Sequence, residues 1–412
     1  MKSLSIKFLT ALIFQLLSNS ISVAAIQPGA TVVQLRKDCG TLDNCFSTMP
    51  SLLDWIWGSG APGESPRNPS ASLPLTVNIG PGEYQPFICR NGPGSSVPKG
   101  FVSLIGSSRD ATKIILRENI EGGPPIQVPV RLANCTNLSF SRLAVITTSA
   151  NVNIGYAIYW TGTGTSTWSD VYVEASRSGD TNYNTPWYDS GVAGLHYWYN
   201  SKLVSIAHAR GINVGYESQG SESWFYGSEI DVVIDNLTPV TRKVMYGLDT
   251  AVSQGDIRLF GSVIRVLVDD SQGLVDGDFT FYGIRSGTAQ AHMHGGSISV
   301  DGSKATGTVT AIGISGNSHV HDTAITVKPG QGGGSAIRVE GDLAEAPFIW
   351  PPGKQLPAVK STNGSDTFVE TDCNSSGICD GVAIEDQQPH MMIYSENCTS
   401  RWFDSTVNAC RP

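Results

Sequence analysis

Short runs of alternating apolar and polar residues, separated by corners rich in Gly, Ser and Asn, occupy most of the chain. A period of two is typical of β-strands that bury one face, whereas the period of an amphipathic helix is about 3.6 residues. The repeating units in the middle of the chain contain no amphipathic stretch long enough for a helix. The pattern therefore predicts an all-β fold and excludes helical repeats.

The runs also resemble one another at regular intervals: FYGSEIDVVI at 225–234, LFGSVIRVLV at 259–268 and the shorter MHGGSISV at 293–300. Their glycines, Gly227, Gly261 and Gly295, lie 34 residues apart. A second series interleaves with the first: YGL at 246–248, YGI at 282–284 and IGI at 312–314. Such units stack as coils around a continuous apolar core, so we expect a β-solenoid. A sandwich of hairpins remains an alternative, because two Asp-Gly pairs fit hairpin turns.

Both ends of the chain differ from the repeats. The stretch 45–60 places Leu52, Leu53, Ile56 and Trp57 on one helical face, which predicts a helix that caps the open end of the coils. A Pro-rich, non-repeating stretch at 346–357 marks where the coils stop. The expected organisation is a cap region at 26–74, a β-helix at 75–343 and a Cys-containing tail at 344–412.

Residues 1–25 have the features of a cleaved signal peptide: a charged flank, a short apolar core and a small-residue cleavage site. The protein is therefore expected to be secreted, periplasmic or attached to the cell surface. Its eight cysteines gather toward the two ends of the chain, and in an exported protein they are read as disulfides. Cys39–Cys45 and Cys373–Cys379 could each close a small loop.

The formal net charge of −9 argues against binding to nucleic acid or to anionic membranes. The segment 75–175 resembles the opening of right-handed parallel β-helix enzymes, above all pectinesterases. The shared elements are the strand at 77–79, the corner Pro81-Gly82-Glu83-Tyr84, the strand at 101–106 and the strand at 112–116. The resemblance implies a right-handed parallel β-helix of the pectin lyase-like kind.

The catalytic elements of pectinesterases are only partly matched. Asp180 in "GDTNY" aligns with the Asp of the family's Gln-Asp-Thr element, and the resemblance implies that Asp180 is the general acid. Gly179 replaces the preceding Gln, however, and Ser223 stands where the nucleophilic Asp is expected. A polygalacturonase-like set of Asp249, Asp269-Asp270 and His294 is a second candidate, with solvated corner residues as the alternative.

A lyase would need a base and acidic residues that bind the uronate, often through Ca²⁺. Arg210 is a candidate base and Asp170 a candidate acidic residue, with ordinary surface charge as the alternative. Ca²⁺ is the only cofactor that such a site would require, and no metal ligands are predicted otherwise.

Aromatic residues are densest between 186 and 226. We expect Trp187, Tyr197, Trp198 and Trp224 to form a platform for sugar rings. Alternation places Trp198 on one face of its strand and Tyr197 on the other, so an aromatic stack inside the coil is the alternative. The predicted function is action on, or binding to, an extracellular acidic polysaccharide such as pectin, by a monomer. The alternative is a non-enzymatic surface or adhesion protein on the same scaffold.

Overall fold

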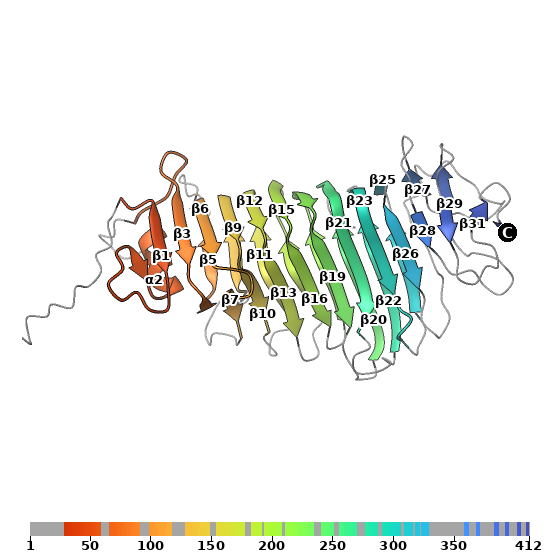
Figure 1. Ribbon diagram of the computed structural model, residues 1–412, viewed down its shortest axis with the longest axis horizontal. Helices are drawn as coiled ribbons and strands as arrows, with labels where there is room; N and C mark the ends of the chain where they lie inside the picture. The colour runs from red at the N-terminus through yellow and green to blue at the C-terminus, as the bar shows by residue number, and fades with distance from the viewer. Residues whose placement is uncertain are drawn as a thin grey trace, which may run out of the picture.

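The computed structural model describes residues 29–58, 66–90, 99–117, 128–148, 154–177, 183–191, 193–207, 211–234, 240–250, 255–269, 277–286, 291–305, 309–315, 318–321 and 323–328, followed by six short strands beyond residue 357. These residues form parallel β-strands that lie side by side along the long axis of the molecule (Figure 1). The expected parallel β-helix is confirmed, because strands separated by one coil pair in parallel and not as hairpins.

Each coil contributes one strand to each of three stacks. Stack 1 contains β3 (Leu75–Ile79), β6 (Lys99–Gly106), β9 (Cys135–Ser141), β12 (Thr163–Ser169), β15 (Ala193–Tyr199), β18 (Glu222–Tyr226), the first halves of β21 (Ile257–Val268) and β23 (Ala291–Asp301), and β25 (Ser318–His321). Stack 2 contains β4 (Gly82–Tyr84), β7 (Thr112–Leu116), β10 (Ala144–Thr147), β13 (Tyr172–Arg177), β16 (Lys202–Ala207), β19 (Glu229–Ile234), the second halves of β21 and β23, and β26 (Ala324–Lys328).

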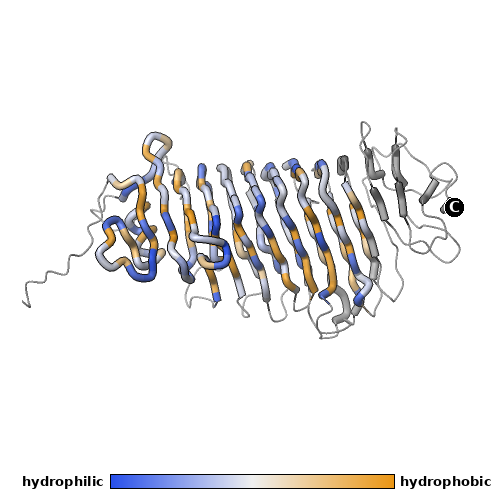
Figure 2. The backbone as a smooth tube through the Cα atoms, in the orientation of Figure 1, coloured by the Kyte–Doolittle hydropathy of each residue, from blue (hydrophilic) through white to orange (hydrophobic). Residues whose placement is uncertain are grey.

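Stack 3 is a separate sheet of eight strands: β5 (Phe87–Arg90), β8 (Val130–Ala133), β11 (Ile154–Thr161), β14 (Tyr183–Asp189), β17 (Gly211–Ser218), β20 (Val240–Thr250), β22 (Gly277–Ser286) and β24 (Val309–Ser315). Orange and blue positions alternate along many of the coils in Figure 2. The apolar residues point inward and form one continuous core, as the sequence pattern predicts.

The 34-residue glycine repeat marks the corner between stacks 1 and 2. Gly227, Gly261 and Gly295 adopt left-handed backbone conformations, with φ of 57°, 56° and 69°. Asp170 and Asn200 occupy the same corner in earlier coils, with φ of 53° and 47°. Asp, Asn and Gly are the residues that tolerate this conformation best. Arg142, with φ of 52°, occupies the corner one coil before Asp170 and departs from this preference.

The second glycine series has a different cause. Gly215, Gly247 and Gly283 stack in consecutive coils of stack 3, and a Cβ atom on any of them would lie 2.4 Å from the Cγ2 atom of an isoleucine in the adjoining stack. These isoleucines are Ile230, Ile264 and Ile298. The glycines therefore allow close packing between stacks.

The predicted N-terminal helix is present as α2 (Met49–Trp57), the only helix in the described part of the chain. Thr48 caps it by accepting a hydrogen bond from the Ser51 N–H. Its buried face, which includes Leu52 and Ile56, packs at the N-terminal end of the coils (Figure 1). Within the cap region, β1 (Val32–Leu35) pairs in parallel with β3 and with β2 (Cys45–Phe46).

Two disulfides link cysteines of the described N-terminal part. Cys39–Cys45 closes the small loop that the sequence suggests, and Cys89–Cys135 joins stack 3 to stack 1. The side chains of the four C-terminal cysteines lie outside the described residues. No helix in the described part has the length and apolar character needed to cross a membrane.

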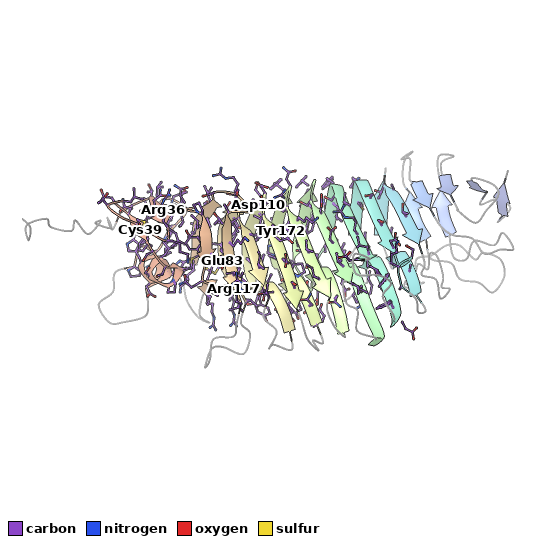
Figure 3. The ribbon with its side chains drawn as sticks, turned by 60° about the horizontal axis from the view of Figure 1, so that its bottom comes forward. Arg36, Cys39, Glu83, Asp110, Arg117 and Tyr172 are labelled. Carbon is purple, nitrogen blue, oxygen red and sulfur yellow. A yellow bond between two sulfur atoms is a disulfide. The ribbon has the colours of Figure 1, made fainter. Side chains whose placement is uncertain are left out.

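The predicted corner at Pro81-Gly82-Glu83-Tyr84 is mostly strand: Gly82–Tyr84 form β4, and the chain turns at Gly80 and Pro81, between β3 and β4. The Tyr84 side chain is buried, and its hydroxyl contacts the carbonyl oxygens of Leu35, Gly80 and Pro81. Glu83 forms an ion pair of 2.7 Å with Arg117, which follows the neighbouring strand (Figure 3).

Parallel pairing also continues beyond the expected end of the β-helix. The strands β27 (Ala358–Ser361), β28 (Phe368–Glu370), β29 (Ala383–Asp386) and β30 (Met392–Tyr394) follow β25 and β26 in register. The last two strands, β31 (Trp402–Asp404) and β32 (Ala409–Arg411), pair in the antiparallel direction.

We predict opposite outcomes for substitutions at the two kinds of glycine. Gly247→Ala places a methyl group against Ile264 and should reduce the free energy of unfolding by about 1–3 kcal/mol. Gly261→Asn should cost less than about 1 kcal/mol, because nothing lies within 4 Å of its Cβ and Asn tolerates the left-handed corner. Urea denaturation of both variants measures the difference, and an equal or larger loss for Gly261→Asn would contradict this assignment.

Candidate functional site

The aromatic run divides between the inside and the outside of the coils. Trp187 and Trp198 are fully buried, so the prediction that their rings face outward as a sugar platform is wrong. Trp198 stacks in the core between Trp168 and Phe225, with ring centroids 5.1 and 5.8 Å away. Trp187 packs edge-on against Trp198. The alternative of an internal aromatic stack is correct for these two residues.

Three predicted catalytic residues receive no support as a group. Asp180 and Arg210 lie outside the described residues. Asp170 occupies the left-handed corner, and its carboxylate is 3.8 Å from the Arg109 guanidinium, with both side chains about half exposed. The structure thus places Asp170 at a corner beside Arg109, and its catalytic role stays a prediction. Asp231, another acidic residue of the coils, is paired with Lys202 and Arg265.

The outer face of stack 1 carries a further column of rings. Tyr199, Tyr226, Phe260 and His294 follow one another in register, with centroids 5.0, 5.1 and 5.2 Å apart and ring planes within 11° of parallel. We call this set the outer ladder. Because the rings stack along the axis of the coils, each inner ring has both faces covered by its neighbours.

Tyr199 is the first ring of the outer ladder and is 37% exposed. Its register partner on the N-terminal side is Ser169, which is too small to cover the ring face. Tyr197 lies beside it, with centroids 6.4 Å apart and the two planes within 12°, and its partner is the small residue Thr167. The two tyrosines therefore form a step whose ring faces open toward the N-terminal coils.

A strip of small hydroxyl residues lies in front of this step. Ser141 and Ser169 are register partners in one column, and Ser103, Ser139 and Thr167 follow one another in the next. All five are partly exposed. The strip offers hydrogen-bond donors and acceptors next to two open ring faces, the combination that stacks on and orients a sugar ring.

A groove of about 580 Å³ adjoins the step on the same face. Its lining residues are Gly164, Thr165, Ala193, Gly194, Leu195, Gly220, Glu222, Gly255, Asp256 and Arg258. Thr165 and Leu195 lie two residues before Thr167 and Tyr197 on the same strands. The volume is in the range of small-ligand sites.

Charged side chains form one wall of the groove. Glu222 accepts a hydrogen bond of 2.7 Å from the Trp224 indole N–H, and the Arg258 guanidinium lies 4.6 Å from the centre of the same ring. Arg258 also pairs with Asp256 at 3.6 Å. Trp224 is therefore on the outer face as predicted, but the guanidinium covers one face of its ring.

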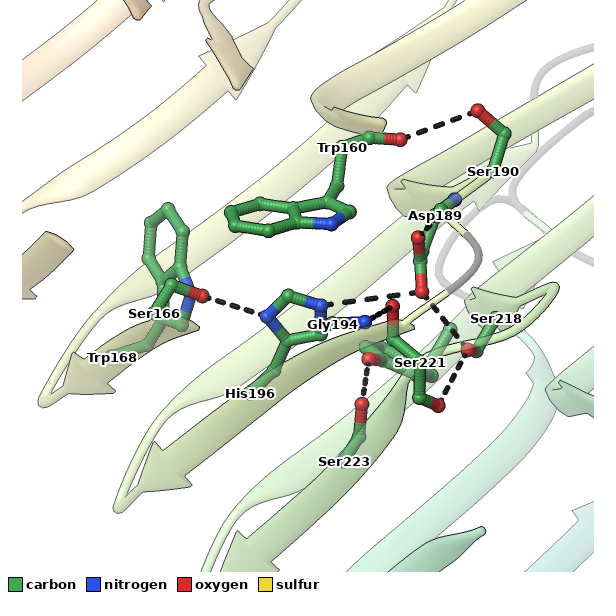
Figure 4. A network of polar contacts seen from close by, with 12 residues as sticks. Trp160, Ser166, Trp168, Asp189, Ser190, Gly194, His196, Ser218, Ser221 and Ser223 are labelled. Carbon is green, nitrogen blue, oxygen red and sulfur yellow. Dashed lines mark hydrogen bonds and ion pairs between the residues drawn. The ribbon is translucent and has the colours of Figure 1, made fainter. Parts of the chain in front are cut away.

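A buried polar network lies behind the groove floor (Figure 4). His196 Nδ1 is 2.9 Å from Ser166 Oγ, and His196 Nε2 is 4.0 Å from Asp189 Oδ2. These residue types form catalytic triads elsewhere. Here Ser166, His196 and Asp189 are buried, and Ser166 accepts a hydrogen bond from the Trp168 indole, so no substrate can reach the hydroxyl.

The network supports the floor of the groove instead. The Gly194 N–H donates to Ser221 Oγ at 2.9 Å, and a Cβ on Gly194 would lie 2.6 Å from His196 Nε2. Asp189 is held by the Gly191 N–H and by the Ser218 hydroxyl. The polar groups thus fix the backbone that the groove exposes.

A second cluster of charged groups lies on stack 3. Glu217 and Asp249 are register partners on β17 and β20, and Asp249 is 3.2 Å from Arg285 Nε. Burial, and secondarily the nearby Asp249 charge, raises the pKa of Glu217 to about 7. Gln219 donates to Glu217 Oε1, whereas Oε2 is buried and has no hydrogen-bond partner in the structure.

A comparison with models of known protein families finds no match, and a comparison with curated proteins finds none either. The side chains that the structure describes contain no group of three or more His, Cys, Asp or Glu residues arranged to hold a metal ion. The candidate site is therefore defined by its geometry: the tyrosine step, the hydroxyl strip and the groove.

We predict that His196 makes the protein sensitive to acid. Burial lowers the pKa of His196 to about 3, from an ordinary value of 6.5. Its contribution to stability is complete above about pH 6.5 and declines as the pH falls toward 3. In this range His196 is protonated in the unfolded chain but stays neutral in the folded protein. The slope of the free energy of unfolding against pH approaches about 1.4 kcal/mol per pH unit.

The check is urea denaturation between pH 7 and pH 4. His196→Gln should have a shallower pH dependence than the wild-type protein, whereas the exposed control His294→Gln should retain the wild-type slope. Equal slopes in the wild-type protein and His196→Gln would contradict the assignment.

Proposed function

We propose that the protein is an exported polysaccharide-binding protein that holds a sugar chain against the outer face of stack 1. The observation that carries the proposal is the step formed by Tyr197 and Tyr199, whose ring faces open onto the hydroxyl strip beside the groove. Each ring can stack on one sugar unit, and the Ser and Thr hydroxyls can bond to the sugar hydroxyls.

The proposal covers neutral as well as acidic polysaccharides. Glu222 and Asp256 outnumber Arg258 in the groove, so its charges do not select an acidic chain. Export is supported by the two disulfides of the N-terminal part and by the signal-like sequence at 1–25.

The step predicts a ranking among the tyrosines. Tyr199→Ala and Tyr197→Ala should each weaken polysaccharide binding by roughly five- to tenfold, since aromatic stacking contributes on the order of 1 kcal/mol. Tyr226→Ala is the matched control, because Tyr199 and Phe260 cover both faces of its ring. Affinity electrophoresis against pectin, alginate, xylan and β-glucan measures the effect.

Two results would overturn the binding proposal. One is the absence of retardation of the wild-type protein in every polysaccharide of the panel. The other is an equal loss of affinity in Tyr226→Ala and Tyr199→Ala, since the covered ring should not contribute to stacking.

The cluster on stack 3, a different face of the coil from the tyrosine step, favours a second candidate function, hydrolysis of a polysaccharide chain that binds over stack 3. A carboxyl group with a pKa near 7 can donate a proton at neutral pH, while Arg285 favours the ionised form of Asp249. Neighbouring parallel strands are about 4.8 Å apart, which is close to the carboxyl separation of a retaining glycosidase.

Glu217→Gln tests this second candidate in two ways. It should remove any release of reducing ends from a polysaccharide substrate. It should also raise the free energy of unfolding at pH 8 by about 1–3 kcal/mol, because a Glu with a raised pKa is stabilising below its ordinary range and loses that contribution as the pH passes 7. Unchanged reducing-end release would exclude the catalytic role, and unchanged stability would exclude the raised pKa.

A further inference from the structure

The two rings of the tyrosine step share one plane, which is turned across the axis of the coils. Tyr199 stacks on Tyr226 of the next coil, with centroids 5.0 Å apart and planes within 8° of parallel, so the normal of its ring points largely along the axis. Tyr197 precedes Tyr199 by two positions on β15, and the two ring planes differ by 12°. Alternate residues are displaced along the strand, so these two rings lie side by side.

The orientation of this plane sets the direction of a bound sugar chain. A pyranose that stacks on an aromatic ring lies with its mean plane parallel to that ring. A sugar on Tyr199 therefore lies across the axis, at the level of Ser169 in the preceding coil, and a sugar on Tyr197 lies at the level of Thr167. A chain that joins the two sugars follows the direction of β15 and crosses the coils.

The spacing of the rings suits consecutive sugar units. Their centroids are 6.4 Å apart, which is close to the length of one pyranose unit in an extended chain. Only a chain whose neighbouring units keep their planes parallel can use both rings. Chains with β-1,4 linkages between equatorial positions have this ribbon shape, whereas an α-1,4 linkage turns each unit out of the plane of the previous one.

The ring faces also select the configuration of the sugar. Neighbouring units of a β-1,4 ribbon are turned over, so the two tyrosines meet opposite faces of their sugars. Both faces of a gluco- or xylo-configured pyranose expose C–H groups, because every hydroxyl group is equatorial. The axial hydroxyl of a manno-configured unit projects from one face and holds one of the two units away from its ring.

The step continues at one end and stops at the other. Thr165 and Leu195 are the next outward residues beyond Tyr197, and both line the groove, so the third unit of the chain enters it. Beyond Tyr199 the strand ends at the left-handed corner of Asn200. The surface therefore offers two stacking positions followed by one position in the groove.

We propose that the tyrosine step selects a ribbon-shaped, β-1,4-linked chain of gluco- or xylo-configured units. The chain crosses the coils along β15, with one unit on Tyr199, the next on Tyr197 and the third in the groove. Ser169 and Thr167 lie level with the two stacked units and can bond to hydroxyl groups at their edges. This inference rests on the proposed polysaccharide binding and adds the linkage, the configuration and the direction of the chain.

Isothermal titration of the full-length mature protein with cellopentaose, β-1,4-mannopentaose and maltopentaose tests the selection. Cellopentaose should bind roughly five- to tenfold more tightly than either of the others, because each of them loses the stacking on one ring. In Tyr197→Ala only one ring remains, so the preference should fall below about twofold. Tyr226→Ala is the matched control and should keep the wild-type preference, because both faces of its ring are covered.

Two arginine substitutions test the direction of the chain. Thr165→Arg places a long side chain where the third unit enters the groove, and it should weaken cellopentaose binding by at least about threefold. Ser103→Arg is the matched control, because Ser103 lies in the column of Thr167 two coils farther along the axis. It would obstruct only a chain that runs along the axis. Circular dichroism establishes that the variants are folded.

The outcomes separate this inference from the binding proposal on which it rests. If the wild-type protein binds no polysaccharide, both are wrong. If maltopentaose or mannopentaose binds as tightly as cellopentaose, or if Tyr197→Ala keeps the wild-type preference, polysaccharide binding stands and the selection of a ribbon is wrong. If Thr165→Arg has no effect, or if Ser103→Arg weakens binding as much, the direction of the chain is wrong.

Discussion

The in-register pairing of each coil with the next is the constraint on which the structure depends. A residue in one strand lies about 4.8 Å from its partner in the following coil, so every position becomes a column along the axis. A column therefore accepts only residue types that can be repeated at that spacing. The left-handed corner through Asp170, Asn200 and Gly227 and the tight glycine column at Gly215 and Gly247 are two results of this constraint.

The same constraint explains why aromatic residues form two separate stacks. Trp168, Trp198 and Phe225 stack inside the coil, whereas Tyr199 and Tyr226 stack outside it on the same strands. A stack of rings is closed along its length and open only where the column changes to a small residue. The exposed ring faces, and hence the capacity to bind a sugar, lie at the end of a column, next to Ser169 and Thr167.

Alternation, turn residues and repeat spacing were sufficient to predict the β-solenoid, the capping helix and the corner at Gly227. They also placed Tyr197 and Trp198 correctly on opposite faces of their strand. They failed for Trp187, because Asn184, Thr185, Pro186 and Trp187 are all buried and alternation is interrupted there. A single sequence gives no way to see that interruption.

The groove could not be predicted for another reason. Glu222, Asp256 and Arg258 come from neighbouring coils, and their proximity follows from a register that the sequence does not state. The position of Asp170 in the left-handed corner column was not foreseen either, because alternation and composition do not show which residues take a positive φ.

Disulfide trapping across two coils measures this register most directly. Ser141 and Ser169 are outward-facing register partners, whereas Ser139 is displaced from Ser169 by two positions. Register partners lie within the Cα separation that a disulfide allows, and the diagonal distance of about 8 Å exceeds it. Under mild oxidation, Ser141→Cys/Ser169→Cys should form the new disulfide readily and Ser139→Cys/Ser169→Cys should not, as read by peptide mass spectrometry. Equal or reversed yields would contradict the in-register coil on which the tyrosine step rests.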